Sequence, residues 1–477
     1  MNKNRLVPTK GAGPLVALAA LTTLLAGCAH RPVPENLRAM QTDLDRYIAR
    51  PDTNYTWHVA SSGKSNGATV TAIDLVSQAW LTTNEVNRTL WRHWLLVVQP
   101  DEVAHDTALL FIGGGSNKDG NPPKPGEQLL QIAKQTKSVV AELRMVPNQP
   151  LIFGNDGRER VEDDLIAYTW DKFLRTGESR WLARLPMTKA AVRAMDTVTA
   201  FCASPEGGGR SIGQFIVAGG SKRGWTTWTT AAVDRRVVAI APIVIDLLNI
   251  VPSFKHHFRA YGFYAPAVQE YVDMGIMDWM GTKEFDRLLK IVEPYEYRDR
   301  LTMPKLIVNA CGDQFFLPDS SQFYFDDLKG VKYLRYVPNT DHSLKGSDAW
   351  FTLLAWHDAI LNQRPLPQFS WHLSEKEIQV TPATVPKEVR LWQATNPIAR
   401  DFRVETLGAV WTSTVLSPDA AGNYTGRVAT PARGWTAFLV ELTFDLGGPA
   451  PLKLTTPVRV TPAALPFPEP QPKRPRR

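Results

Sequence analysis

The amino-acid sequence predicts an α/β protein with a doubly wound sheet of mainly parallel strands, a helical cap insertion and a small C-terminal β-sandwich. Three observations predict this class. Between residues 108 and 361, apolar segments of strand length alternate with helical segments, which is typical of βαβ units. A stretch rich in aromatic residues and Met interrupts this alternation at 246–301. From about residue 364, short alternating segments separated by turn residues continue without helices.

Domain boundaries follow from these changes of pattern. In chain order we expect a signal segment (1–27), a tether (28–36), an α/β domain (37–363) with its cap at about 247–302, a β-sandwich domain (364–461) and a disordered, Pro-rich basic tail (462–477).

The individual elements are predicted from periodicity. A helix at 37–49 precedes strands at 55–59, 69–75 and 93–98. The strands of the alternating region are expected at 108–112, 138–143, 214–218, 237–243, 305–310 and 333–337. Its helices are expected at 126–135, 163–175, 187–201, 225–233, 320–328 and 348–361. The β-sandwich is expected to use strands at 389–393, 409–415, 437–442 and 452–460.

Composition argues against nucleic-acid binding. The 477 residues carry a formal net charge of only +7, and part of it lies at the two ends of the chain. No folded segment concentrates basic residues, as a nucleic-acid binder would. The hydrophobic fraction of 44% is that of a globular protein with a large core.

The N-terminus has the pattern of an export signal. Basic residues precede an apolar run at 15–25, which is too short for a permanent membrane-spanning helix. The run ends in LAGC at 25–28, which resembles the bacterial lipobox and implies cleavage before Cys28 and lipidation of that residue. We therefore expect a lipid-anchored protein of a Gram-negative cell envelope, and Ala29 favours the outer membrane, facing the periplasm. The alternative is an ordinary signal peptide in which Cys28 has no role.

Two cysteines, Cys202 and Cys311, remain after such cleavage. An oxidising periplasm would permit a disulfide between them. Their expected positions, before one core strand and at the far end of another, favour two buried thiols instead.

Ser221 is the candidate nucleophile. It lies in GGSKRG at 219–224, directly after an apolar strand and before a helical segment. This is the context of the nucleophile elbow of α/β-hydrolases, where small neighbours let the strand and the helix approach. The motif departs from G-x-S-x-G, because position 223 is Arg and the second Gly follows at 224. The spacing of a phosphate-binding Walker loop is absent.

Asp313 and His342 complete a candidate triad. They follow Ser221 in the order that α/β-hydrolases use, and each is expected at the carboxyl end of a strand. His342 would accept the proton of the Ser221 hydroxyl, and Asp313 would hold the imidazole in the required tautomer. Asp246, which ends the apolar segment IVID at 243–246 after the next strand, is an alternative acid.

A glycine-rich loop is the candidate oxyanion hole. The first strand of the alternating region runs into GGGSN at 113–117, so that Gly114 and Gly115 join the N–H of Lys222 as candidate donors. The alternative is a phosphate-binding loop. No metal or cofactor is predicted, because nothing at helical spacing completes a zinc site around His256 and His257.

These residues resemble the PhoPQ-activated pathogenicity-related proteins. The resemblance spans 44–460 and rests on GSKRGW at 220–225, GDQFFLPD at 312–319, VPN at 337–339 with His342, RVEDD at 160–164, VPNQP at 146–150 and PMTK at 186–189. It implies an α/β-hydrolase fold in a family linked to a virulence regulon, and it brings no defined substrate. The Ser-x-x-Gly form of the elbow is also similar to that of glucuronoyl esterases. Arg223 and Asn148 are candidate substrate contacts, with Arg223 as a hypothetical partner of an anionic substrate.

The sequence therefore predicts an exported serine hydrolase that cleaves an ester, or alternatively an amide, of a small molecule or peptide through an acyl-enzyme. Two other functions stay open. One is a non-catalytic binding or signalling protein of the same fold. The other is a peptidase that acts on cationic peptides.

Overall fold

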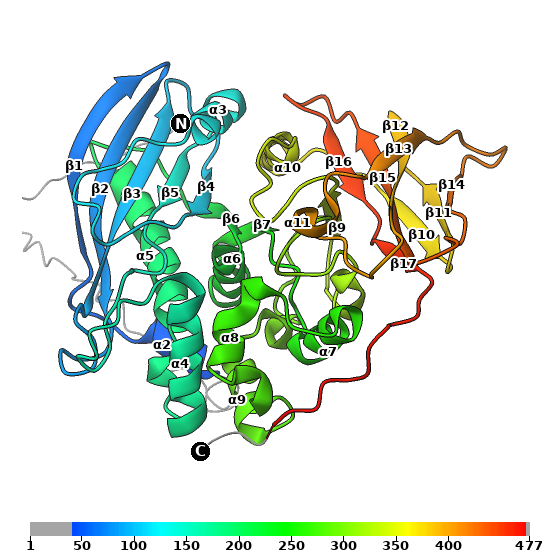
Figure 1. Ribbon diagram of the computed structural model, residues 1–477. Helices are drawn as coiled ribbons and strands as arrows, with labels where there is room; N and C mark the ends of the chain where they lie inside the picture. The colour runs from blue at the N-terminus through cyan, green and yellow to red at the C-terminus, as the bar shows by residue number, and fades with distance from the viewer. Residues whose placement is uncertain (1–40, 474–477) are drawn as a thin grey trace, which may run out of the picture. The chain divides into compact units, whose positions relative to one another are not determined.

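A large mixed sheet forms the centre of the computed structural model, which describes residues 41–473 (Figure 1). Its strands up to residue 337 are β1 (Thr56–Ser65), β2 (Ala68–Ala79), β3 (Leu90–Pro100), β4 (Thr107–Ile112), β5 (Val140–Leu143), β6 (Gln214–Gly220), β7 (Val237–Ile243), β8 (Lys305–Ala310) and β9 (Lys332–Val337). They lie in the order β1-β2-β3-β5-β4-β6-β7-β8-β9. The run from β5 to β9 is parallel, and β1 to β3 add to it as antiparallel strands.

Helices cover both faces of this sheet. They are α2 (Asp43–Ala49), α3 (Glu127–Thr136), α4 (Glu162–Thr176), α5 (Arg184–Ala203), α6 (Lys222–Val233) and α10 (Ala349–Leu361). Alternate residues of β6 point to opposite faces, so that Val217 packs with α5 and α6 while Ile216 packs with α3 and α10. The strand order and the two helical layers confirm the predicted α/β-hydrolase class.

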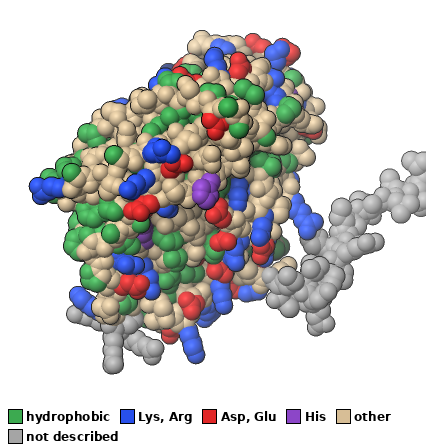
Figure 2. Space-filling view, turned by 90° about the vertical axis from the view of Figure 1, so that its right-hand side faces the viewer, with side chains coloured by type: hydrophobic (Ala, Val, Ile, Leu, Met, Phe, Trp, Pro, Cys, Tyr) green, Lys and Arg blue, Asp and Glu red, His purple; other side chains and the backbone are tan. Residues whose placement is uncertain are grey.

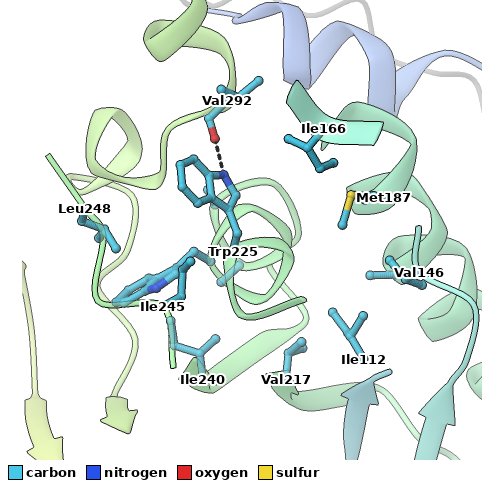
Figure 3. Packing of buried hydrophobic residues seen from close by; sticks show 14 of the residues in the cluster. Ile112, Val146, Ile166, Met187, Val217, Trp225, Ile240, Ile245, Leu248 and Val292 are labelled. Atoms are coloured by element: carbon cyan, nitrogen blue, oxygen red, sulfur yellow. Dashed lines mark hydrogen bonds between the residues drawn. The ribbon is translucent and has the colours of Figure 1, made fainter. Parts of the chain in front are cut away.

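The core beside α6 is built around Trp225. Its indole N–H donates to the carbonyl of Val292 at 2.6 Å, and its ring lies among side chains from the strand ends and the cap (Figure 3). Because Trp225 lies in the first turn of α6, this contact ties the start of that helix to the cap.

The cap lies between β7 and β8, as predicted. It consists of α7 (Ile250–Tyr261), α8 (Gln269–Asp273), α9 (Lys283–Val292) and the short helices η2 (Pro266–Val268), η3 (Ile276–Trp279) and η4 (Pro294–Tyr297). Helix α9 is strongly amphipathic and buries Phe285, Leu288 and Leu289 against the rest of the protein.

The C-terminal strands form a small sandwich. The strands β12 (Glu388–Asn396), β13 (Thr412–Val415), β15 (Trp435–Phe444), β16 (Leu452–Thr455) and β17 (Arg459–Thr461) make one layer, and β10 (Phe369–Leu373), β11 (Glu377–Pro382) and β14 (Tyr424–Arg427) make the other. The layers approach closely at Gly426, where a Cβ atom would lie 2.9 Å from the Leu391 side chain. On the face that Figure 2 shows, acidic and basic side chains are interspersed with hydrophobic ones.

The sandwich is continuous with the large sheet. Strand β16 pairs with β9, where Thr455 lies opposite Leu334 and its hydroxyl accepts the N–H of Tyr336 at 3.0 Å. A buried ion pair between Arg335 and Glu441 also crosses the predicted boundary at 364. The β-domain and the α/β domain therefore share one sheet.

Several segments differ from the sequence-based expectations, and β10, β11 and β14 lie outside every expected strand. The helix expected at 320–328 is only the turn η5 (Ser320–Phe323), because Asp319 is held by contacts with distant residues. The strand expected at 452–460 is two strands separated by Pro457. Residues 462–473, expected to be disordered, have defined contacts with α7, where the N–H of Phe467 donates to the carbonyl of Arg259 at 3.0 Å. Residues 474–477 of that tail lie outside the described residues, as do the signal segment, the tether and Cys28.

In the described part of the chain, no helix combines the length and the apolar character needed to cross a membrane.

Candidate active site

Ser221 lies in a strained turn between β6 and α6. Its backbone has φ 57° and ψ −125°, a conformation that non-glycine residues adopt only when the surrounding structure imposes it. The flanking glycines make the turn possible. A Cβ atom at Gly219 would lie 2.8 Å from the carbonyl oxygen of Arg223, and one at Gly224 would lie 2.9 Å from the carbonyl oxygen of Gly219. The local sequence thus forms the elbow through close backbone approach, although it departs from the usual spacing.

His342 and Asp313 form a close pair at the ends of β9 and β8. The imidazole Nδ1 lies 2.7 Å from Oδ2 of Asp313, whose Oδ1 accepts the N–H of Phe315 at 2.7 Å. The Phe315 ring packs against the imidazole with 4.3 Å between centroids. Because a carboxylate accepts hydrogen bonds, this contact favours the tautomer with the proton on Nδ1, which leaves Nε2 as a base.

One cavity, of about 520 Å³, brings Ser221 and His342 together. Its lining also includes the loop 342–347, Phe111 and Trp350. The Nε2 atom of His342 is buried and has no hydrogen-bond partner among the described residues. The contact between Ser221 and His342 is therefore not formed in this structure. Such contacts are often long in enzymes without substrate.

Asp246 has other partners. It is fully buried after β7, and its two oxygens accept the hydroxyls of Tyr324 and Tyr336, each at 2.6 Å. Burial raises its pKa to about 8 despite these hydrogen bonds, and the nearby Asp313 adds to the rise. The carboxyl next to His342 is thus that of Asp313, while Asp246 belongs to a separate buried cluster.

Two of the candidate oxyanion donors, Lys222 and Gly114, lie next to Arg223. Lys222 is the first residue of α6, so its N–H has no acceptor within the helix. Gly114 lies against the Arg223 guanidinium, where a Cβ atom would be 2.7 Å from a guanidinium nitrogen. The carbonyl of Gly114 accepts the N–H of Met145 at 2.9 Å, which fixes the loop that also contains Gly115. Their role as donors stays a prediction.

A charged brace joins this loop to the elbow. The guanidinium of Arg223 donates to both oxygens of Glu162, at 2.8 and 2.6 Å, and to the carbonyl of Val146 at 2.5 Å. Lys222 pairs with Glu162 at 2.8 Å and with Asp163 at 2.9 Å. Burial opposes ionisation of Glu162, but the hydrogen bonds and charges of Arg223 and Lys222 outweigh it and lower its pKa to about 2.

The two candidate substrate contacts, Arg223 and Asn148, both form hydrogen bonds with other residues of the protein. Arg223 could bind an anionic substrate only in competition with Glu162. Asn148 is 1% exposed, donates to the carbonyl of Arg92 and lines neither cavity at Ser221. The proposed contact between Asn148 and a substrate is a sequence-based expectation that this geometry does not support.

A second, small cavity of about 40 Å³ lies under the cap beside Ser221. Most of its lining is apolar: Trp170, Trp225, Ile245, Leu247, Ile250, Phe254, Val268, Ile276, Met277, Phe285, Phe315 and Phe316. Its polar lining comes from Ser221, Lys222, Asp163, Arg184 and Tyr271.

The sequence did not single out several of these lining residues. Tyr271 of the cap donates to Asp163 at 3.0 Å, and Arg184 lies over the ring of Trp225 at 4.5 Å. The high aromatic and Met content of the cap was the available signal, but it does not say which side chains face Ser221. Trp350 lies partly buried in the largely apolar helix α10, where no pattern separates lining residues from core residues.

The two neighbouring histidines of α7, His256 and His257, have hydrogen-bond partners within the protein. Nε2 of His256 faces Asp319 at 3.1 Å, and Nε2 of His257 accepts the N–H of Ala265 at 2.9 Å. Burial lowers the pKa of His257 to about 3, which keeps it neutral. Across residues 41–473, no group of three or more His, Cys, Asp or Glu side chains is arranged to hold a metal ion.

Cys202 and Cys311 are buried thiols with no bridge between them. Burial raises the pKa of Cys202 to about 12 and raises that of Cys311 well above its ordinary value.

Known proteins resemble this chain over most of its length. The sequence model of the PhoPQ-activated pathogenicity-related protein family matches residues 44–403. Autocrine proliferation repressor protein A of Dictyostelium discoideum is 36% identical over 460 residues, which are 89% of this chain and 92% of that protein. Among solved structures, the acetyl xylan esterase from Paenibacillus sp. R4 has a TM-score of 0.47 at 14% identity and covers 67% of this chain and 95% of its own. The glucuronoyl esterase from Solibacter usitatus has a TM-score of 0.36 at 13% identity, with 72% and 98% covered.

Proposed function

The chain belongs to the PhoPQ-activated pathogenicity-related protein family, and we propose that it is a serine hydrolase that cleaves a carboxylic ester through an acyl-enzyme. One observation carries the proposal. The strained turn at Ser221 and the His342–Asp313 pair meet at one cavity, and the base atom Nε2 of His342 has no other partner there.

The residues divide the reaction between them. Nε2 of His342 takes the proton of the Ser221 hydroxyl as the oxygen attacks the ester carbonyl. The N–H of Lys222, with that of Gly114 or Gly115, stabilises the negative oxygen of the tetrahedral intermediate. His342 then protonates the leaving alcohol, and water repeats the sequence to release the acid. Asp313 stabilises the imidazolium in both steps.

The two cavities favour an ester with a small acyl group and a larger alcohol group. The small apolar cavity under the cap has room for a short acyl group, since a single water needs roughly 10–15 Å³ by the same measure. The larger cavity, which includes the polar loop 342–347, would hold the alcohol. An amide in place of the ester uses the same residues and is the nearest alternative.

Turnover of a substrate panel tests this function. We expect the wild type to hydrolyse p-nitrophenyl acetate and longer p-nitrophenyl esters, with a preference for short chains, and Ser221→Ala to lose this activity. Ser370→Ala, an exposed Ser→Ala change on β10, is the matched control and keeps it. Hydrolysis of acyl-peptide amides in preference to esters would favour the peptidase alternative. Absence of any turnover would favour a binding role, which is a specific concern because the Dictyostelium relative is named as a repressor of proliferation.

We also propose that the protein is exported and lipid-anchored through Cys28. The support is the basic segment, the short apolar run and the lipobox-like LAGC at 25–28. Metabolic labelling with a fatty acid tests it, because Cys28→Ala should lose the label. Equal labelling of the wild type and Cys28→Ala would contradict the anchor.

A further inference from the structure

A third cavity, of about 320 Å³, lies between the cap, the segment that follows Asp313 and the C-terminal strands. Its walls come from α7, from 319–326, from β10 and from 457–465, with Arg400 at its side. None of its lining residues lines either cavity at Ser221. It is therefore separate from the site of the proposed reaction.

One wall of this cavity is a buried charged triad. Arg400 donates to Asp319 at 2.5 Å, and His256 lies 3.1 Å from both oxygens of the same carboxylate. Burial alone would raise the pKa of Asp319, but the charges of Arg400 and His256 outweigh it and hold the pKa well below its usual range. The carboxylate is thus ionised and already shared between two partners. Arg400 is 3% exposed, and its Nε–H has no acceptor.

A second guanidinium in the lining has no hydrogen-bond or ion-pair partner among residues 41–473. Arg459 of β17 forms no ion pair with any described residue, and its Nε atom is buried without an acceptor. Asp326 also lines the cavity but does not pair with Arg459. Buried donors in proteins normally have a partner, so these two guanidinium N–H groups in one lining are available to an acceptor that enters the cavity.

The remaining lining is mostly apolar. Phe325, Trp371, Leu373 and Val458 contribute to it, and the Trp371 ring lies 5.8 Å from the ring of Phe325. A bare inorganic anion would leave this surface uncovered.

We propose that this cavity binds a small organic carboxylate with an apolar body. The carboxylate accepts hydrogen bonds from the unpaired guanidinium of Arg459 and from Nε of Arg400, because the planar fork of Arg matches a carboxylate. The apolar body packs against Trp371 and Phe325. The volume is at the lower end of the range of ligand pockets, which fits a molecule with one ring.

Calorimetric titration with benzoate tests this site. We expect saturable binding of benzoate to the wild type. Its dissociation constant should rise at least about tenfold in Arg459→Gln, which removes the charge-assisted hydrogen bonds. Arg459→Lys should lie between the two, since it keeps the charge and loses the fork. Arg433→Gln, the same change at an exposed position outside the cavity, should bind as the wild type does.

Two ligand controls use the wild type alone, so they hold even if Arg459→Gln fails to fold. Benzamide, which has the ring without the charge, and inorganic phosphate, which has the charge without the ring, should both bind much more weakly than benzoate. No benzoate binding, equal binding to wild type and folded Arg459→Gln, or equal binding of benzamide or phosphate would overturn the proposal.

Discussion

Replacing Asp313 by Asn tests which carboxylate orients His342. In the structure, Asp313 accepts the Nδ1 proton at 2.7 Å and the N–H of Phe315 at 2.7 Å. Asn has nearly the same volume, and its carbonyl retains one of these bonds. When its amide nitrogen faces Nδ1, however, the amide donates a hydrogen bond to Nδ1, and the imidazole proton must then lie on Nε2. The base is then blocked, and we expect kcat to fall about 10³–10⁴-fold, as removal of a triad carboxylate does elsewhere.

The same change at Asp246 is the contrasting variant. Burial raises the pKa of Asp246 to about 8, so the uncharged carboxyl dominates at pH 7. Asn is also uncharged and has nearly the same volume, and its carbonyl oxygen still accepts one of the two tyrosine hydroxyls that donate to Asp246. We therefore expect Asp246→Asn to keep its activity and to change the free energy of unfolding by less than about 1 kcal/mol at pH 4, where the wild-type carboxyl is uncharged in the folded protein.

The pH dependence of stability separates the two carboxyls further. A carboxyl whose pKa is raised by folding stabilises the protein fully below its unfolded pKa of 3.8, and this contribution is lost as the pH rises toward 8. Asp246→Asn does not have this loss. The difference in Tm between Asp246→Asn and the wild type should therefore shift in favour of the variant as the pH rises from 4 to 8.

Steady-state hydrolysis of p-nitrophenyl acetate, with circular dichroism as a check of folding, measures the activity of both variants. A folded Asp313→Asn that keeps its kcat, together with a folded Asp246→Asn that loses it, would refute the assignment of the acid.

Three further predictions concern stability and reactivity. Arg223→Met should lower the free energy of unfolding, measured by urea titration, by about 1–2 kcal/mol; this value is discounted because Glu162 is partly exposed. It should also lower kcat about tenfold, because the glycine loop loses its contact with Arg223. An unchanged kcat in the folded variant would contradict the role of this ion pair. Burial lowers the pKa of His93 to about 4, so between pH 6.5 and 4 the wild type should lose up to about 3 kcal/mol of unfolding free energy relative to His93→Gln, which does not titrate there. A constant difference between the two proteins would be the contrary result. Cys202 and Cys311 should react with a thiol reagent only after unfolding in guanidinium; rapid reaction of the native protein would show that they are not buried thiols.

Local features of the site could be predicted from the sequence. The apolar strand β6, the glycines around Ser221 and the helix α6 are neighbours in the chain, so their pattern specifies the turn directly. The positions of Asp313 and His342 followed from the rule that parallel strands carry functional residues at their carboxyl ends. The choice between Asp313 and Asp246 needed the structure, because both residues end a strand and only their side-chain partners differ.

Contacts between distant segments could not be predicted. The ion pair of Arg223 with Glu162 joins two parts of the chain, and without it Arg223 resembles a free substrate contact. The pairing of β16 with β9 likewise depends on how the sandwich docks. Residues 462–473 look disordered from their proline content, and contacts with distant residues, such as the Phe467 ring against Gly262, show where they pack.

Mass spectrometry after treatment with a fluorophosphonate probe tests the central claim most directly. If Ser221 is the activated nucleophile, the folded wild type should carry one adduct, located on the peptide that contains Ser221, and folded Ser221→Ala should carry none. Absence of an adduct on the folded wild type, or an adduct that persists in Ser221→Ala, would contradict the proposed serine hydrolase.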